Sequence, residues 1–297
     1  MALAEAFAKL AALAERPLDD DQAVEMFSGA NRPQFWSGRS ISLEMRARML
    51  DFPFARLRLA PLLAVLCLFI AAGSAVETKS PPAKSGPTPV PSGVYGFEPE
   101  LWNQPRADFW SHRKEDQGAV VFVGDSITQG WSSLAAAFPK LKVANRGIPG
   151  DTSVGVLFRL QEDVLDLNPK AVVLLIGTND TRNGDRDAGF VAGKIAEILD
   201  RITAFNAKLP IVVCHVMPRG LQVGAFPDKL IAINQLIDKR AAGRPNVGIC
   251  DTWAIYAQKD GSCLKEEFPD LLHPNAAGYQ KWADALKPLF QKCKLIP

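Results

Sequence analysis

The sequence predicts an α/β domain in which helices cover both faces of a parallel sheet. Three observations lead to this prediction: short apolar runs recur along the chain, stretches with helical periodicity lie between them, and several runs end in a turn that contains glycine and polar residues. Continuous runs of β-branched residues and leucine are typical of strands buried on both faces. Alternation of such strands with helices is typical of parallel sheets.

Five apolar runs are the expected strands. Two of them, AVVFVG (119–124) and AVVLLIG (171–177), are continuously apolar. Three more, KVANRG (142–147), IVVCHV (211–216) and VGIC (247–250), are expected to extend the same sheet. The sheet should therefore have about five strands.

Helices are predicted where apolar residues recur on one face. The last helix is expected to begin at about Asn275 and to continue through YQKWADALKPLF. Two earlier helices have their apolar faces at Val191, Ile195, Ile198, Leu199 and Ile202, and at Leu230, Ile233, Leu236 and Ile237.

The composition argues against nucleic-acid binding and against a metal site. The chain has 34 Lys and Arg against 32 Asp and Glu, a net charge of +2, and its basic residues form no stripe. A nucleic-acid partner is therefore not expected. The cysteines have neither C-x-x-C spacing nor companion histidines, so no zinc site is expected and their redox state is open. They are Cys67, Cys214, Cys250, Cys263 and Cys293.

Arginines, an apolar run and small residues follow one another within residues 45–75. This order is typical of a secretory signal. The apolar run, Leu59 to Ala72, is shorter than the roughly 20 residues of a spanning helix, yet a cleaved signal peptide and an uncleaved signal-anchor both stay open. Either one predicts an extracytoplasmic protein, periplasmic or secreted, and the second adds an N-terminal membrane anchor.

The segments on either side of this signal have different compositions. Residues 1–44 begin with an acidic, alanine-rich stretch, which is explained either by an over-extended N-terminus or by a disordered extension. Residues 76–94 are rich in proline and small polar residues and are expected to form a linker. The folded domain should therefore span residues 95–297.

Polar turns follow three of the expected strands. Ser126 comes just after the first strand, NRG (145–147) ends the second, and GTND (177–180) follows the third. Ligands of such sheets bind beyond the carboxyl ends of the strands. We therefore expect these turns to meet at one edge.

One histidine of three is a candidate base for Ser126, which needs a base to become a nucleophile. His215 lies inside an apolar run and is expected to be a hydrogen-bonded structural residue, and His112 lies in a charged stretch typical of the surface. His273 follows Asp270 by three residues, and this acid can hold the imidazole in the required tautomer. Taken alone, DLLHP fits helix capping and GDS fits a turn, so the prediction depends on the whole set.

An acyl-transfer site also needs hydrogen-bond donors for the oxyanion. The candidates are the N–H groups of Ser126 and Gly147 and the side-chain amide of Asn179. The alternative roles are structural: Gly147 as a turn glycine and Asn179 as part of an Asx turn. Ile148 and Pro149, beside Gly147, are rigid apolar residues and are candidates for the wall of the substrate pocket.

Four segments, GDSITQG, NRGIPGD, GTND and DLLHP, resemble the sequence blocks of the SGNH (GDSL-type) hydrolases, in the family order over about residues 95–292. The resemblance implies a flavodoxin-like α/β/α sandwich with a parallel sheet of about five strands, and no metal or organic cofactor. It implies that Ser126 attacks, that His273 is the base oriented by Asp270, and that Ser126, Gly147 and Asn179 form the oxyanion hole.

The stretch from 145 to 180, with MPRG (217–220) and INQLI (233–237), is most similar to the catalytic subunits of platelet-activating-factor acetylhydrolases. This resemblance implies a small acylated substrate with a short acyl group. A lipid ester suits the resemblance and a carbohydrate ester suits an exported enzyme, and both stay open. Two alternatives stay open: a lysophospholipase or thioesterase, and a non-catalytic binding module on the same fold. The alcohol half of the substrate and the oligomeric state have no readable signal.

Overall fold

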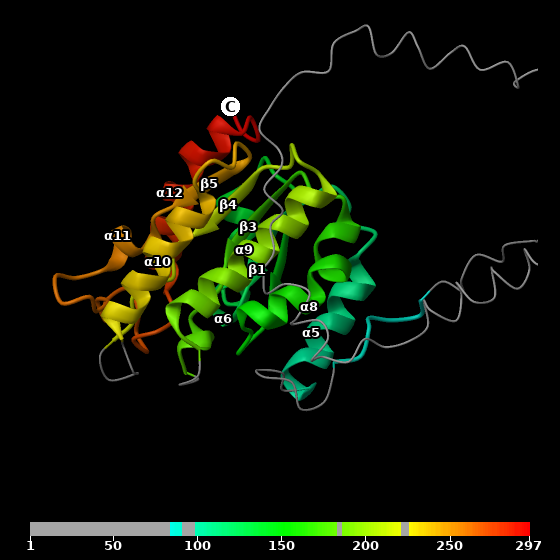
Figure 1. The fold of residues 1–297 in the computed structure, drawn as a ribbon. Coiled ribbons are helices and arrows are strands. Elements are labelled where there is room, and N and C mark those ends of the chain that lie inside the picture. The colour runs from blue at the N-terminus through cyan, green and yellow to red at the C-terminus, as the bar shows by residue number, and fades with distance from the viewer. Residues whose placement is uncertain (1–83, 91–98, 183–185, 221–225) are drawn as a thin grey trace, which may run out of the picture. The chain divides into compact units, whose positions relative to one another are not determined.

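The computed structural model describes residues 84–90, 99–182, 186–220 and 226–297. They contain a five-stranded sheet in the order β2-β1-β3-β4-β5 in which every pair of neighbours is parallel. This order is that of flavodoxin-like sheets, so the predicted fold class is confirmed. The strands are β1 (Val120–Gly124), β2 (Val143–Gly147), β3 (Ala171–Leu175), β4 (Ile211–Cys214) and β5 (Val247–Cys250) (Figure 1).

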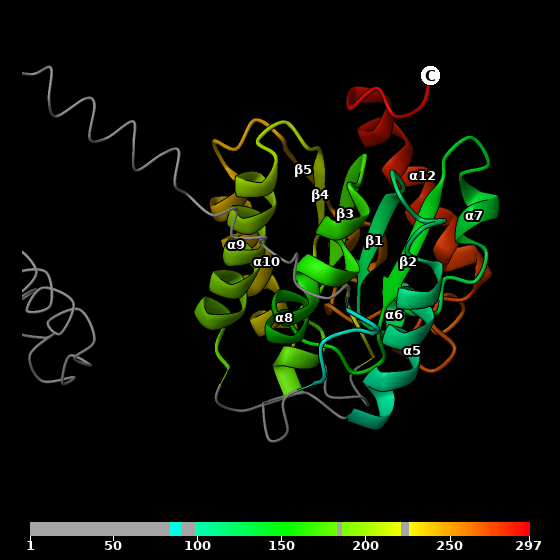
Figure 2. The ribbon, with the colours of Figure 1, turned by 90° about the vertical axis from the view of Figure 1, so that its right-hand side faces the viewer.

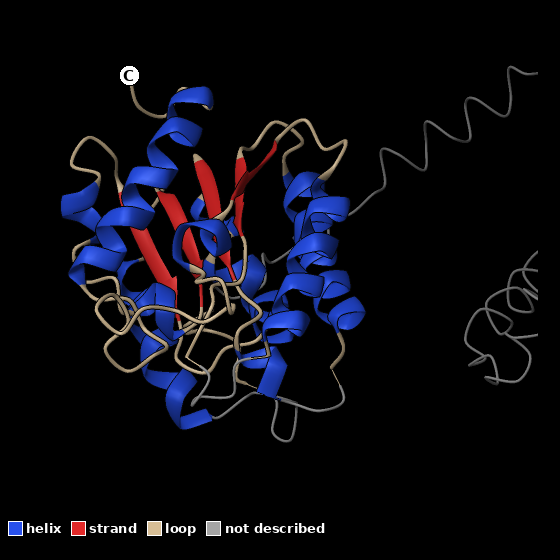
Figure 3. Ribbon diagram, turned by 90° about the vertical axis from the view of Figure 1, so that its left-hand side faces the viewer, coloured by secondary structure: helices blue, strands red, loops and turns tan. Residues whose placement is uncertain are grey.

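Helices cover both faces of the sheet (Figure 2). One face packs on α8 (Ser153–Asp163), α9 (Ala188–Phe205) and α10 (Pro227–Ala241). The other packs on α6 (Ser126–Gln129), α7 (Leu134–Ala137), α11 (Thr252–Tyr256) and α12 (Ala276–Lys292). Figure 3 shows the strands enclosed between these two layers. The chain thus forms the predicted three-layer sandwich.

The continuous apolar runs become strands because each successive side chain enters the opposite core layer. Val121 and Val123 of β1 pack with α8 and α9, whereas Val120 and Phe122 pack with α7 and α12. The predicted apolar face of α9 is fully buried, and that of α10 is buried except for Leu236, which is half-buried. Asn275 caps α12 at the predicted position by accepting the Gly278 N–H.

An N-terminal clamp joins residues 84–90, which were assigned to the linker, to the domain. Glu162 of α8 accepts hydrogen bonds from the Thr88 N–H at 2.9 Å and from Lys84, and Arg106 of α5 (Pro99–His112) pairs with it at 2.7 Å. Burial acts to raise the pKa of Glu162, but these bonds outweigh it and lower that pKa to about 2. The clamp consists of Lys84, Thr88, Arg106 and Glu162, and it ties the chain down upstream of residue 95.

Residues 1–44 and 45–75, with their predicted extension and signal, lie outside the described residues. Among the described helices, none combines the length and the apolar character needed to cross a membrane.

Candidate active site

Ser126 is placed by the junction between β1 and α6. β1 ends at Gly124, Asp125 is extended, and its side-chain Oδ1 caps the next helix by accepting the Ile127 N–H at 2.9 Å. Ser126 is the first residue of that helix, and N–H groups in a first turn have no partner within the helix. Its hydroxyl and its N–H therefore both lie at the carboxyl edge of the sheet.

Asp270 and His273 share a loop that precedes α12. The Asp270 carboxylate accepts N–H bonds from Leu272 at 3.0 Å and from His273 at 2.7 Å, which closes a tight turn. Leu271 has a left-handed φ of 64° inside this turn, and its carbonyl accepts the Gly220 N–H at 2.7 Å. The loop conformation thus depends on both the acid and the segment after β4.

These two segments, 147 residues apart in the chain, meet in a continuous hydrogen-bonded relay. His273 Nε2 lies 2.8 Å from Ser126 Oγ, and His273 Nδ1 lies 2.6 Å from Asp270 Oδ2. The His273 side chain is 36% exposed, so the relay is open to solvent. The geometry is that of a nucleophile, a base and an orienting acid.

The charge on Asp270 suits this arrangement. Burial acts to raise the pKa of its carboxyl, but the hydrogen bonds from the His273 backbone and ring and from the Leu272 N–H outweigh that effect and hold the pKa below its usual value. Asp270 therefore stays ionised near neutral pH and can accept the Nδ1 proton of the ring.

Asn179 begins the short 3₁₀ segment η2 (Asn179–Arg182). This segment follows β3, the strand that pairs with β1, so Asn179 lies at the same end of the sheet as Ser126. Its side chain is almost buried, and Nδ2 donates to the Asp151 carbonyl at 2.9 Å. A side-chain amide has two N–H donors. This bond orients the amide and leaves the second N–H for a ligand.

Gly147, the other sequence-predicted donor, has a different role in the structure. Its N–H donates to Asn145 Oδ1 at 2.9 Å. A Cβ at this position would lie 2.2 Å from the Gln129 N and 2.7 Å from the Asp125 carbonyl. Gly147 is thus needed for the close packing of β2 against α6, and its N–H is already engaged.

Gly150 offers an alternative donor that sequence reasoning missed. Asp151 N–H donates to the Ile148 carbonyl at 3.2 Å, and Gly150 has a φ of 75°, so residues 148–151 form a type II turn with Pro149 in second position. Among the described residues no hydrogen bond occupies the Gly150 N–H. The Pro-Gly pair after an apolar residue was the signal for this turn.

Buried charged residues connect the ends of the strands that precede these turns. Arg159 pairs with Asp151 at 2.8 Å and also donates to the carbonyls of Gly124 and Arg146, which links the ends of β1 and β2. Burial, with the negative charges of Asp151 and Asp180, raises the pKa of Asp125 to about 7 against the Ile127 hydrogen bond.

The other histidines behave as predicted. His215 is buried and lies 2.9 Å from both Asp251 Oδ1 and Asp238 Oδ1, which makes it a hydrogen-bonded structural residue. His112 is exposed at the end of α5. Within the part of the chain that is described, no three His, Cys, Asp or Glu side chains group in a way that could hold a metal ion.

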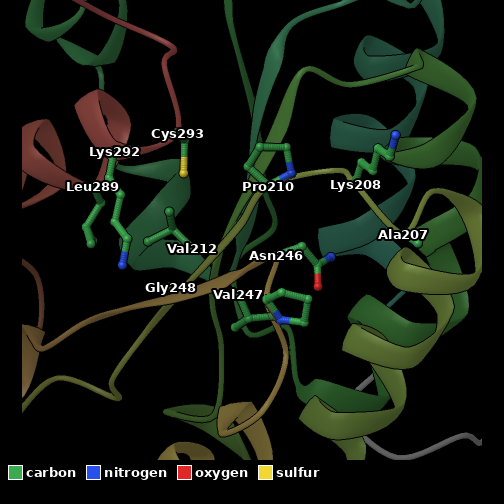
Figure 4. Close-up of a pocket in the computed structure, with 11 residues that line it drawn as sticks. Ala207, Lys208, Pro210, Val212, Asn246, Val247, Gly248, Leu289, Lys292 and Cys293 are labelled. Carbon is green, nitrogen blue, oxygen red and sulfur yellow. The ribbon is translucent and has the colours of Figure 1, made fainter.

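A hollow of about 390 Å³ lies away from this site, at the amino ends of β4 and β5 (Figure 4). Val212, Gly248 and Leu289 form much of its apolar surface, with Lys208 and Lys292 around it. Because it occupies the opposite edge of the sheet from Ser126, we do not assign it to the relay.

Comparison with known proteins gives a consistent result. The model of the GDSL-like Lipase/Acylhydrolase family matches residues 122–281. Platelet-activating factor acetylhydrolase IB subunit alpha2 of Homo sapiens is 30% identical over 216 residues, 70% of this chain and 92% of that protein. Subunit alpha1 of Mus musculus is 31% identical over 220 residues, 72% and 90% of the two chains.

Among solved structures, a GDSL-like lipase from Bacteroides thetaiotaomicron aligns with a TM-score of 0.53 at 26% identity. The alignment covers 60% of this chain and 90% of the lipase. The sequence and structural comparisons therefore agree with the predicted family and fold.

Proposed function

Because the chain belongs to the GDSL-like lipase/acylhydrolase family and is a carboxylic ester hydrolase, we propose that it is a serine esterase that removes short acyl groups from a small ester. The observation that carries this proposal is the relay from Asp270 through His273 to Ser126, with separations of 2.6 and 2.8 Å. Distances in this range allow proton transfer between the groups.

In the proposed mechanism, Ser126 Oγ attacks the ester carbonyl while His273 Nε2 takes the hydroxyl proton. Asp270 stabilises the imidazolium and fixes its orientation. When the tetrahedral intermediate collapses, His273 passes the proton to the leaving alcohol and an acyl-serine remains. His273 then takes a proton from water, which attacks the acyl-serine, and returning that proton to Ser126 Oγ releases the acid.

For the oxyanion we assign the Ser126 N–H, the Asn179 amide and the Gly150 N–H, in place of Gly147. The support is that Gly147 already donates to Asn145, whereas no hydrogen bond among the described residues occupies the Gly150 N–H. The turn that contains Gly150 ends at Asp151, whose carbonyl accepts from the Asn179 amide. Preorganised donors of this kind stabilise the charge that develops in the transition state.

We assign acetyl as the preferred acyl group, because the relatives reported above are acetylhydrolases by name. The suggested pocket wall does not contribute support: Ile148 is fully buried against Trp102, and only Pro149 is half-exposed beside it. Acetylated carbohydrates and acetylated lipids are the two classes of natural substrate that we propose. Hydrolysis of lysophospholipids or thioesters is the alternative activity.

The test is hydrolysis of p-nitrophenyl acetate by the wild-type protein and by Ser126→Ala. We expect turnover by the wild type and its loss in a variant that keeps its fold by circular dichroism. A folded wild-type protein without turnover would favour the binding-module alternative, and near-wild-type turnover by Ser126→Ala would exclude this serine as the nucleophile.

We further propose that the enzyme acts outside the cytoplasm, through a signal in residues 45–75. The support is the order of arginines, apolar residues and small residues in that segment. Fractionation of cells followed by mass analysis of the N-terminus tests this proposal, and a protein recovered intact only from the cytoplasm would refute it.

A further inference from the structure

Buried arginines in the described part of the chain follow a rule with one exception. Four of them have a carboxylate within ion-pair distance: Arg106 with Asp163, Arg146 with Asp116, Arg159 with Asp151, and Arg186 with Asp180. The fifth, Arg219, is 2% exposed and pairs with no carboxylate among the described residues.

The described hydrogen bonds of the Arg219 guanidinium are made to neutral groups, and they engage only some of its N–H donors. Nη2 donates to the Thr181 hydroxyl at 2.5 Å, and Nη1 lies 3.5 Å from the Thr178 carbonyl. Nε is buried and has no partner among the described residues. Burial, together with the positive charge of Arg182, lowers the pKa of Arg219. Arg182 follows Thr181, the residue whose hydroxyl accepts from Arg219, so a second cation lies close to Arg219, and neither has a counter-charge among the described residues.

The position of Arg219 connects it to the proposed site. Thr178 and Thr181, its two partners, stand on either side of Asn179. The next residue, Gly220, donates its N–H to Leu271, which lies between Asp270 and His273. Arg219 thus lies between the loop of an oxyanion donor and the loop of the base.

Burying a cation without a charged partner costs free energy, and ligand binding at this edge can supply the missing charge. A guanidinium donates from several N–H groups in a planar fork that fits carboxylate and phosphate oxygens. We propose that Arg219 and Arg182 form a subsite for an anionic group on the ester substrate, a carboxylate or a phosphate. This inference rests on the proposed esterase function and narrows its substrate class.

Two classes of substrate carry such an anionic group: an acidic sugar carries a carboxylate, and a lipid headgroup carries a phosphate. Three acetyl esters separate them: 4-acetoxybenzoate, 4-acetoxyphenyl phosphate and the neutral 4-acetoxybenzamide. Their intrinsic reactivities differ, but that difference cancels when each variant is compared with the wild type.

We expect Arg219→Gln to lower kcat/KM for the anionic esters about tenfold or more relative to the neutral ester, mainly through KM, because the variant loses hydrogen bonds to a charged group. Arg182→Gln, at an exposed position, should lower the same ratio severalfold without risk to folding, and Arg219→Lys should lose only part of it. Arg240→Gln, an exposed arginine on α10, is the matched control and should leave the ratio unchanged.

Equal losses for charged and neutral esters would overturn the subsite and make Arg219 a structural brace. Binding of phenyl phosphate and benzoate, measured by calorimetry on the wild type and on Arg182→Gln, tests the subsite without turnover. Binding that weakens in the variant supports it even if no ester is hydrolysed, in which case only the esterase proposal fails. Absent or unchanged binding refutes the subsite.

Discussion

Asp125→Asn should stabilise the protein at high pH and have little benefit at low pH. The Asp125 carboxyl is fully buried, one of its oxygens has no described partner, and its pKa is raised to about 7 from 3.8. Asparagine has nearly the same shape, and its Oδ1 can still accept the Ile127 N–H that caps α6. The substitution therefore removes the charge and keeps the cap.

The sign follows from proton linkage. In the folded protein Asp125 keeps its proton up to about pH 7, whereas in the unfolded chain it loses it near pH 3.8. Between these values the folded state binds more protons, so this group makes the free energy of unfolding fall as pH rises. One pKa unit corresponds to 1.36 kcal/mol. The variant should thus gain at most about 4 kcal/mol over the wild type between pH 4 and pH 8.

Urea unfolding of both proteins at pH 4.5, 6 and 8.5 measures the effect. Asp228→Asn, which removes an exposed carboxyl from the first turn of α10, controls for the loss of one negative charge. A difference between variant and wild type that is the same at pH 4.5 and 8.5 would refute the raised pKa of Asp125.

Three further predictions concern the relay, a glycine and the acyl group. Ser126→Ala and His273→Ala should each lower kcat on the order of 10⁶-fold, and the double variant should be no worse than either, whereas Asp270→Asn should cost less; additive losses in steady-state kinetics would contradict a relay. Gly147→Ala should lose about 3 kcal/mol of stability because its Cβ would meet backbone at 2.2 Å, while Gly193→Ala, with open space in α9, should gain about 0.5–1 kcal/mol; thermal unfolding compares them. In a series of p-nitrophenyl esters from acetyl to dodecanoyl, kcat/KM should fall about tenfold from acetyl to butyryl, and a maximum at octanoyl or longer would replace acetylesterase with lipase or thioesterase.

Local patterns predicted the sheet because its central strands β1, β3 and β4 are continuous apolar runs buried on both faces, and the edge strands β2 and β5 contain shorter apolar stretches and are only partly buried. All five strands lie within the predicted segments, and the last helix begins one residue after Asn275. By contrast, nothing in the sequence pattern predicted α5, because its burial is concentrated in a few positions such as Trp102 and Arg106. Trp102 packs on Ile148, a contact that depends on the tertiary fold.

The active site also has features that the sequence predicted and features that it did not. Ser126, Asp270 and His273 were predicted from short motifs, since each motif sets the residue at a strand end or in a turn, and the structure brings them within hydrogen-bond distance. Which glycine N–H is free was not predictable from the motifs alone, because it depends on the orientation of the Asn145 side chain, which accepts the Gly147 N–H. The unpaired state of Arg219 was hidden for the same reason, since it depends on which carboxylates lie near it in space.

The N-terminal clamp also limits the distance between the domain and any point at which the preceding chain is attached. If residues 45–75 hold the chain at a membrane, a free linker over residues 76–94 would extend at most about 65 Å at ~3.5 Å per residue. Lys84 and Thr88 are bonded to Glu162, so the chain is attached to the domain from residue 84 onward, and the remaining residues 76–83 cannot span more than about 28 Å. In an anchored enzyme, the clamp would therefore shorten the greatest distance between the anchor and the start of the domain by more than half.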